Sequence, residues 1–197
     1  MAYEEENKYN RLEELNGSNY QIVEGEPDIT GWDVIDGQGH RIGEVDDVLF
    51  NPQTRDVRYI IVDLSENELD IVEDKKVLVP IGIAELRDEY DDDTLETDTI
   101  TEVGVNDDAV DDEEALDEEI VFLPSVTAEQ LLALPAYDKD SLSPEYETCV
   151  RNVFEPPVND AIVVYEPDTF YTHEHFNNKI YPRNDSSLSG RSGSSDI

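Results

Sequence analysis

The sequence contains a single cysteine, Cys149, and no long apolar run. One thiol excludes an intramolecular disulfide and any zinc site built from several cysteines. The longest apolar segments, such as 77–84 and 161–165, are much shorter than the roughly 20 residues that a transmembrane helix needs. The acidic start of the chain also lacks the apolar core of a secretory signal. These features predict a soluble, cytoplasmic protein with no integral membrane segment, and leave open a peripheral position at the inner face of the membrane.

Basic residues are scarce, with 13 Lys and Arg against 50 Asp and Glu and a formal net charge of −37. Nucleic-acid binding needs clustered basic side chains that replace phosphate counterions, so this composition excludes it as a general activity. Anionic lipid surfaces are disfavoured for the same Coulombic reason. The acidity extends along the whole chain, which suggests two interpretations. One is halophilic adaptation to a salt-rich cytoplasm, where ions screen self-repulsion; the other is an ordinary protein with acidic loops.

The densest acidic stretch lies at about 88–117 and carries no Lys or Arg. It has few large apolar residues among like charges, so burial cannot offset the entropy lost on ordering it. We therefore predict a mobile acidic insertion loop. The remaining organisation is an N-terminal arm at 1–19 with a short helix around "RLEEL", a domain at 20–137, and a partly disordered C-terminal tail at 138–197.

The residues from 31 onwards alternate in the manner of β-strands separated by tight turns. Expected strands are 31–36, 40–51, 57–65, 75–86 and 118–125. The first two flank an Asp-Gly turn, which is a strong hairpin signal. The third is so rich in Val, Ile and Tyr that it should be covered on both faces. Pro80 interrupts the fourth, which places that strand at an edge or at a bend.

A helical pattern follows the strands. Thr127 is a good N-cap, Gln130 completes a capping box, and Pro135 ends the short helix. A second helix can begin in the tail with Ser143 as N-cap and Pro144 at its first position. Closely spaced strands followed by one short helix predict a mainly β fold, a small antiparallel β-barrel.

Two motifs near the first hairpin could suggest a ligand. Gly37, Gly39 and Gly43 almost form a dinucleotide fingerprint, but the third glycine is one position late and a strand follows where a helix is needed. A hairpin turn and a strand bend explain them better. Asp46 and Asp47 are neighbours in a strand, so they point to opposite faces and cannot chelate one ion without a bulge. We expect turn-bonding or rim residues there, and no bound cofactor.

The tail contains the aromatic and histidine-rich motif "YTHEHF". His173 and His175 share a face in an extended chain and could bind a transition metal together, but no Cys or third His is near in the sequence. We favour a docking segment made by Tyr171, His173, His175 and Phe176, and no metal. No nucleophile elbow or comparable context supports a Ser-His-Asp centre, which argues against an enzyme.

Three stretches together resemble the PRC-barrel family: 27–64, 75–86 and 120–137. The residues that carry the resemblance, in order and spacing, are Gly31, Trp32, Asp33, Gly43, Asp46, Asp47, Tyr59, Asp63 and Pro80, followed by the helix at Thr127. The family takes its name from the cytoplasmic domain of the photosynthetic reaction-centre H subunit, and it includes the C-terminal domain of a ribosome-maturation factor. This chain is most similar to bacterial stand-alone PRC-barrel proteins, some of which are linked to stress-response domains. The acidic insertion is longer than the usual link at that place.

The resemblance implies a PRC-type β-barrel that serves as a non-enzymatic binding or scaffold module, with a protein partner of unknown identity and a possible homodimer. The net charge and the motifs considered above lead us to expect no nucleic-acid partner and no cofactor. Two narrower roles stay open as alternatives. One is a reaction-centre-like role in photosynthetic electron transfer at the cytoplasmic membrane face. The other is a ribosome-maturation accessory that would contact a basic ribosomal protein.

Overall fold

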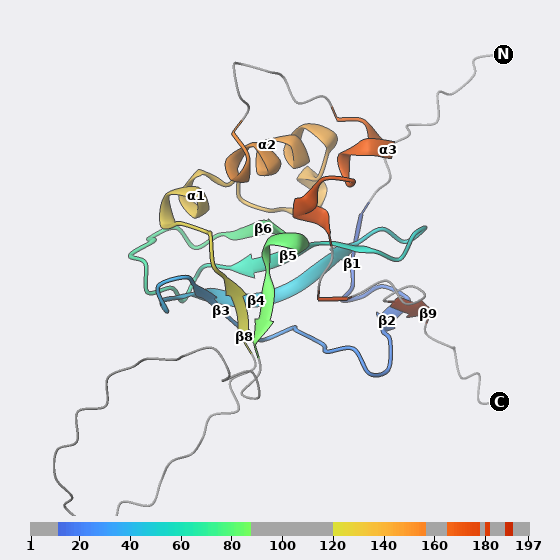
Figure 1. Ribbon diagram of the computed structural model, residues 1–197, viewed down its shortest axis with the longest axis horizontal. Coiled ribbons are helices and arrows are strands. Elements are labelled where there is room, and N and C mark those ends of the chain that lie inside the picture. The colour runs from blue at the N-terminus through green and yellow to red at the C-terminus, as the bar shows by residue number, and fades with distance from the viewer. Residues whose placement is uncertain (1–11, 88–119, 157–164, 178–179, 182–187, 191–197) are drawn as a thin grey trace, which may run out of the picture.

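A computed structural model describes residues 12–87, 120–156, 165–177, 180–181 and 188–190 (Figure 1). The predicted acidic insertion at 88–117 lies outside these residues. So do the first eleven residues of the N-terminal arm and much of the predicted tail.

The chain folds around one mainly β sheet, as the sequence predicts. Its strands lie in the order β6-β5-β4-β3-β8-β7, and β1 pairs with β4. Their bounds are β1 Glu13–Glu14, β3 Asp33–Asp36, β4 Arg41–Phe50, β5 Val57–Asp63, β6 Lys76–Pro80, β7 Glu85–Arg87 and β8 Ile120–Leu123. A separate two-stranded sheet joins β2 (Tyr20–Ile22) to β9 (Leu188–Gly190).

The sheet is mixed, and this corrects the expected all-antiparallel arrangement. β8 runs parallel to β3 and antiparallel to β7, so it lies between two strands that are far from it in sequence. A parallel pair needs a long crossover connection, which here includes β4 to β7 and residues 88–119. Short turns dominate the sequence pattern, and a short turn can join only antiparallel strands. The pattern therefore gave no sign of the parallel pair.

The outer strands β6 and β7 are joined by a single-turn 3-10 helix, η1 (Ile81–Ile83). Pro80 ends β6 at this bend, and β5 is the only described partner of β6. This confirms the prediction that Pro80 places its strand at an edge or at a bend. Among the described residues no ladder connects β6 to β7, so the hydrogen-bonded sheet is open there and η1 provides a covalent link.

The core lies on both sides of β5. Every residue from Val57 to Val62 is buried, which confirms the prediction of a strand covered on both faces. The β3–β4 hairpin is also confirmed. Its turn is held by Asp36, whose carboxylate accepts the backbone N–H groups of Gln38 and His40.

The helices follow the capping signals of the sequence. α1 (Ala128–Ala133) has the complete capping box of Thr127 and Gln130, and α2 (Pro144–Phe154) begins after Ser143. Two shorter elements follow, α3 (Pro167–Phe170) and the 3-10 helix η5 (Glu174–Phe176). Figure 1 shows α1, α2 and α3 on the same side of the sheet, and α2 contacts β6. Within the described ranges, none of the helices has the length and apolarity required to cross a membrane.

The short helix predicted around "RLEEL" is wrong for the residues that are described there. Glu13 and Glu14 form β1 instead, opposite Phe50 and Leu49 of β4. Leu12 and Leu15, on either side of β1, are both buried. A helix of about one turn is unstable by itself, so pairing with the sheet and burial of two leucines decide the local structure.

Candidate functional site

The glycines and acids of the family signature shape the sheet. Gly31 donates its N–H to the carbonyl of Val45 over 2.8 Å, and the backbone of Trp32 accepts from the same residue. Asp33 forms an ion pair with Arg41 across the hairpin at 2.7 Å. These residues fix how the chain enters and leaves the first two strands.

Gly43 is required by a close approach of two chain segments. A Cβ at this position would overlap the backbone carbonyl of Asp63 on the neighbouring strand β5. The Asp63 side chain accepts the N–H of Ser65 at 2.9 Å and so closes the turn that follows. The bend expected at Gly43 is therefore a place where only glycine lets β4 lie against β5.

Asp46 and Asp47 lie at a β-bulge. Val45 pairs with Val62 and Asp47 pairs with Ile61, so no residue of β5 is paired with Asp46. Despite the bulge, the two carboxylates have different partners. Asp46 forms an ion pair with Lys76 at 2.6 Å, whereas buried Asp47 accepts the N–H of Asn16 at 3.1 Å. Burial raises the pKa of the Asp47 carboxyl above its ordinary value, although bonds from backbone N–H groups oppose the rise.

Tyr59 lies at a buried polar junction beneath α2. Its hydroxyl donates to the carboxylate of Glu147 over 3.0 Å, and the hydroxyl of Tyr171 donates to the same oxygen. The guanidinium of Arg58 lies 4.7 Å from the centre of the Tyr171 ring. Burial and then the charge of Glu147 raise the pKa of Tyr171, so its phenol stays protonated as a donor. This junction fastens α2 and the residues around Tyr171 to β5.

The C-terminal segment, defined here as residues 165–177, packs on β5 and η1 of its own chain. Phe176 is only 2% exposed, and its ring centre lies 5.3 Å from that of Tyr59. The backbone at Glu174 and His175 touches η1 at Gly82, where a Cβ would come within 2.5 Å of the Glu174 carbonyl oxygen. Phe176 therefore serves intramolecular packing, and a docking role for this segment towards a partner stays a prediction.

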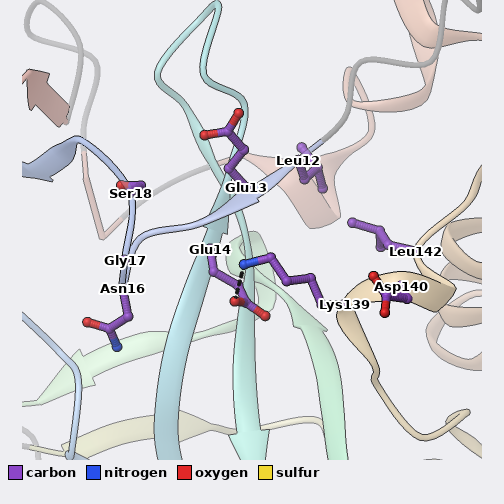
Figure 2. Close-up of a pocket in the computed structure, with 9 residues that line it drawn as sticks. All are labelled: Leu12, Glu13, Glu14, Asn16, Gly17, Ser18, Lys139, Asp140 and Leu142. Atoms are coloured by element: carbon purple, nitrogen blue, oxygen red, sulfur yellow. Dashed lines mark hydrogen bonds and ion pairs between the residues drawn. The ribbon is translucent and has the colours of Figure 1, made fainter.

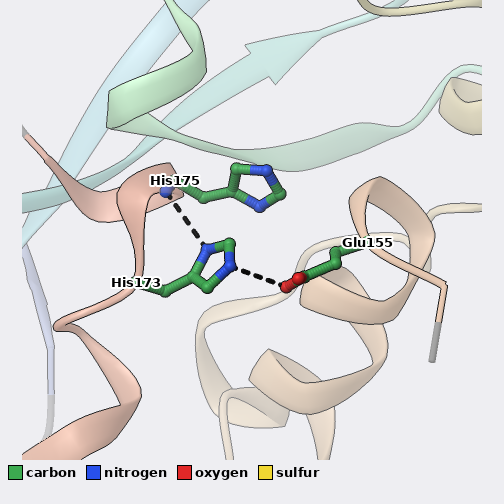
Figure 3. Close-up of side chains that lie close together, drawn as sticks. All are labelled: Glu155, His173 and His175. Carbon is green, nitrogen blue, oxygen red and sulfur yellow. Dashed lines mark hydrogen bonds and ion pairs between the residues drawn. The ribbon is translucent and has the colours of Figure 1, made fainter. Parts of the chain in front are cut away.

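The same segment places both predicted histidines beside a third ligand type (Figure 3). Oxygen and nitrogen atoms of Glu155, His173 and His175 lie within 4.8 Å of one another. Nε2 of His173 is 2.8 Å from the Glu155 carboxylate, and Nδ1 of His173 accepts the backbone N–H of His175 at 3.2 Å. Glu155 follows the last turn of α2, and sequence reasoning missed it because nothing local links it to the histidine motif.

Within this cluster, burial shifts the pKa of His175 and that of Glu155 in opposite directions. Burial lowers the pKa of His175, and the neighbouring His173 adds to this effect, so the ring is neutral at neutral pH. Burial pushes the pKa of Glu155 upwards, but the charges and hydrogen bonds of His173 and Arg151 outweigh it and hold that pKa below its usual value. The cluster therefore combines an ionised carboxylate with a neutral imidazole.

A groove opens where β1 faces the segment after α1 (Figure 2). Its volume is about 460 Å³, and its lining residues are Leu12, Glu13, Glu14, Asn16, Gly17, Ser18, Lys139, Asp140 and Leu142. Lys139 reaches across to Glu14 at 2.6 Å, and the Tyr137 hydroxyl donates to the same carboxylate at 2.9 Å. The sequence carried no sign of this groove, because its walls come from two segments that lie far apart in the chain, 12–18 and 139–142.

The strand order and the signature geometry define a small, mainly β domain with a mixed sheet. Residues 25–104 match the family model of the PRC-barrel domain, the family that the signature residues indicated. The comparison with curated proteins found no match.

Proposed function

We propose that this protein is a non-enzymatic binding module that recognises a basic segment of a protein partner in the groove beside β1. The observation that carries the proposal is the groove itself, which combines acidic side chains with an apolar wall. The PRC-barrel domain supplies the rigid support, since β1 is held on β4 and the opposite wall follows α1.

The groove suits a long basic side chain. Glu13 and Asp140 are exposed at its rim, while Leu12 and Leu142 offer apolar surface within it. Lysine and arginine pack their aliphatic stems on apolar surface and keep the charged group in a polar environment. Lys139 already occupies one such position on Glu14, which shows the kind of contact that a second cation would repeat.

The overall charge of −37 favours the same partner class. A strongly acidic surface attracts a basic protein over distances near the Debye length and raises its association rate. A second copy of this chain would carry the same negative charge, and the repulsion disfavours a homodimer through this face. We therefore assign the groove to a different, basic protein.

The test uses a fluorescent peptide rich in Lys and Leu, titrated with the full chain. The double variant Glu13→Gln/Asp140→Asn removes two charges from the groove. The matched control Glu129→Gln/Glu145→Gln removes two exposed charges from the first turns of α1 and α2. We expect the groove variant to bind about tenfold more weakly and the control to bind like the wild type.

Equal weakening in both variants would mean that binding is diffuse electrostatic attraction and would overturn the proposed groove. Crosslinking mass spectrometry in cell lysate then asks whether natural partners attach near residues 12–18 and 139–142. A lysate that shows no partner and no self-association, at low and at high salt, would remove the binding-module proposal altogether.

The two narrower roles stay predictions. A reaction-centre-like role requires that the genome encode the other reaction-centre subunits. A ribosome-maturation role, through a basic ribosomal protein, requires co-sedimentation with small-subunit precursors. A stress-related role needs a change in abundance or partner under stress.

A further inference from the structure

The end of α2 and the C-terminal segment bring together three side chains of types that bind transition metals. Glu155 comes from the residue after α2, while His173 and His175 flank the start of η5. Figure 3 shows the two imidazole rings next to each other and the Glu155 carboxylate directed at His173. Their candidate donor atoms all lie within 4.8 Å of one another.

A second observation also points to a ligand. Nδ1 of His175 is buried and has no hydrogen-bond partner among the residues that the structure describes. Buried polar atoms are nearly always satisfied, so this imidazole nitrogen beside two other donors is available to a ligand. The side chains of His173 and Glu155 are 18% and 48% exposed, which leaves a route for an ion to enter from solvent.

We propose that Glu155, His173 and His175 bind one divalent transition-metal ion, which ties the end of α2 to the C-terminal segment. Imidazole and carboxylate ligands together suit ions such as Zn²⁺, Co²⁺ and Ni²⁺. Ligand bonds of about 2.0–2.2 Å place neighbouring donors roughly 3.3 Å apart in a tetrahedral site. Small side-chain rotations achieve this spacing, and water completes the coordination.

Metal binding exchanges existing hydrogen bonds for ligand bonds. Coordination through Nε2 of His173 replaces the contact of that nitrogen with the Glu155 carboxylate. Because an imidazole bound to a metal through Nε2 carries its proton on Nδ1, the bond that Nδ1 accepts from the His175 N–H is lost. Arg151 also competes for Glu155, at 3.4 Å. These losses make the site weaker than a closed structural zinc site, with an expected dissociation constant in the micromolar range.

The bound ion would act as a clamp. The C-terminal segment already touches η1 through Gly82 and buries Phe176 against Tyr59. A metal bridge adds a further attachment of this segment to the end of α2, beyond the hydrogen bond from Tyr171 to Glu147. Occupancy of the site therefore controls how firmly the segment covers this end of the barrel, independently of the groove beside β1.

The test is calorimetric titration of the metal-stripped full chain with Zn²⁺, in excess Mg²⁺ to occupy the many acidic side chains. We expect one high-affinity ion per chain. His173→Ala and His175→Ala should each lower the affinity at least tenfold, and Glu155→Gln should lower it severalfold. The matched control is His40→Ala, because His40 is the only other histidine and lies in the β3–β4 turn on Asp36. It should leave the affinity unchanged.

Cobalt gives a readout that does not depend on stability. Co²⁺ in the site should show visible absorption bands stronger than those of hydrated Co²⁺, and the three ligand variants should lose them. Glu155→Gln changes an exposed side chain and retains the fold, so its spectrum stays interpretable if a histidine variant unfolds. Absence of a one-to-one event, or equal Zn²⁺ affinity in the wild type, His175→Ala and Glu155→Gln, would overturn the proposed site.

Discussion

The contact between η1 and the C-terminal segment predicts a specific effect of Gly82→Ala. An added Cβ would lie 2.5 Å from the Glu174 carbonyl oxygen and 2.7 Å from the backbone of His175, whereas ordinary contacts begin at 3.4 Å. The neighbouring atoms are backbone, so they cannot rotate away. The segment must therefore shift by roughly 1 Å against a close-packed surface.

Two energies decide how the segment responds. Overpacking of this kind costs about 1–3 kcal/mol. Releasing the segment would expose the side chains of Phe170 and Phe176, and each buried phenylalanine contributes about 1.5–3 kcal/mol. Release also breaks the bond from Tyr171 to Glu147. The strain is the smaller quantity, so we expect the segment to stay attached in a shifted position, with the free energy of unfolding lowered by about 2 kcal/mol.

Urea denaturation and hydrogen exchange measure the two parts of this prediction. The unfolding midpoint should fall, and exchange at residues 170–177 should accelerate while α1 keeps its protection. Gly39→Ala is the control, because its Cβ would meet open space and only the positive φ of 89° is unfavourable. It should cost about 1 kcal/mol and leave exchange in the segment unchanged. A Gly82→Ala protein with wild-type stability and exchange would refute the close contact.

Four further changes have expected outcomes. Gly43→Ala forces overlap with the carbonyl of Asp63 inside the main sheet, so we expect loss of about 3 kcal/mol or more, or failure to fold, visible in soluble yield and urea midpoint. Glu147→Ala leaves the hydroxyl of Tyr59 without its buried acceptor and should cost roughly 3 kcal/mol in the same assay. Thr127→Ala removes the α1 capping box and should cost about 1 kcal/mol, whereas Thr127→Ser should restore it. If the acidity is an adaptation to salt, the melting temperature should rise from low to molar KCl, and a constant melting temperature would reject that hypothesis.

Local signals in the sequence predicted much of the fold. The Asp-Gly turn, the apolar run of β5 and the caps at Thr127 and Ser143 all depend on residues within a few positions of one another. Turn chemistry and capping are decided at that range, so these elements form where the pattern indicates. The position of Pro80 was also predictable from local sequence, because proline has no backbone N–H and is restricted to strand edges and bends.

Contacts between distant parts of the chain could not be predicted in this way. The parallel pair of β3 and β8, the pairing of β1 with β4, and the meeting of Glu155 with the two histidines all depend on how far-separated segments fold back. Nothing within a short window distinguishes Glu155 from the other 49 acidic residues. The motif at 171–176 showed two histidines, and only the fold brings the carboxylate of Glu155 to them.

The position of β8 has a consequence for dividing this protein into fragments. β8 lies between β3 and β7, yet it begins at residue 120, beyond the family match that ends at 104. A fragment cut at the family boundary would lack the strand that joins β7 to the rest of the sheet, and two unpaired edges would attract other chains. A peptide that contains β8 should instead fill this gap in trans. The sheet is thus suited to reassembly from two pieces, divided within residues 88–119.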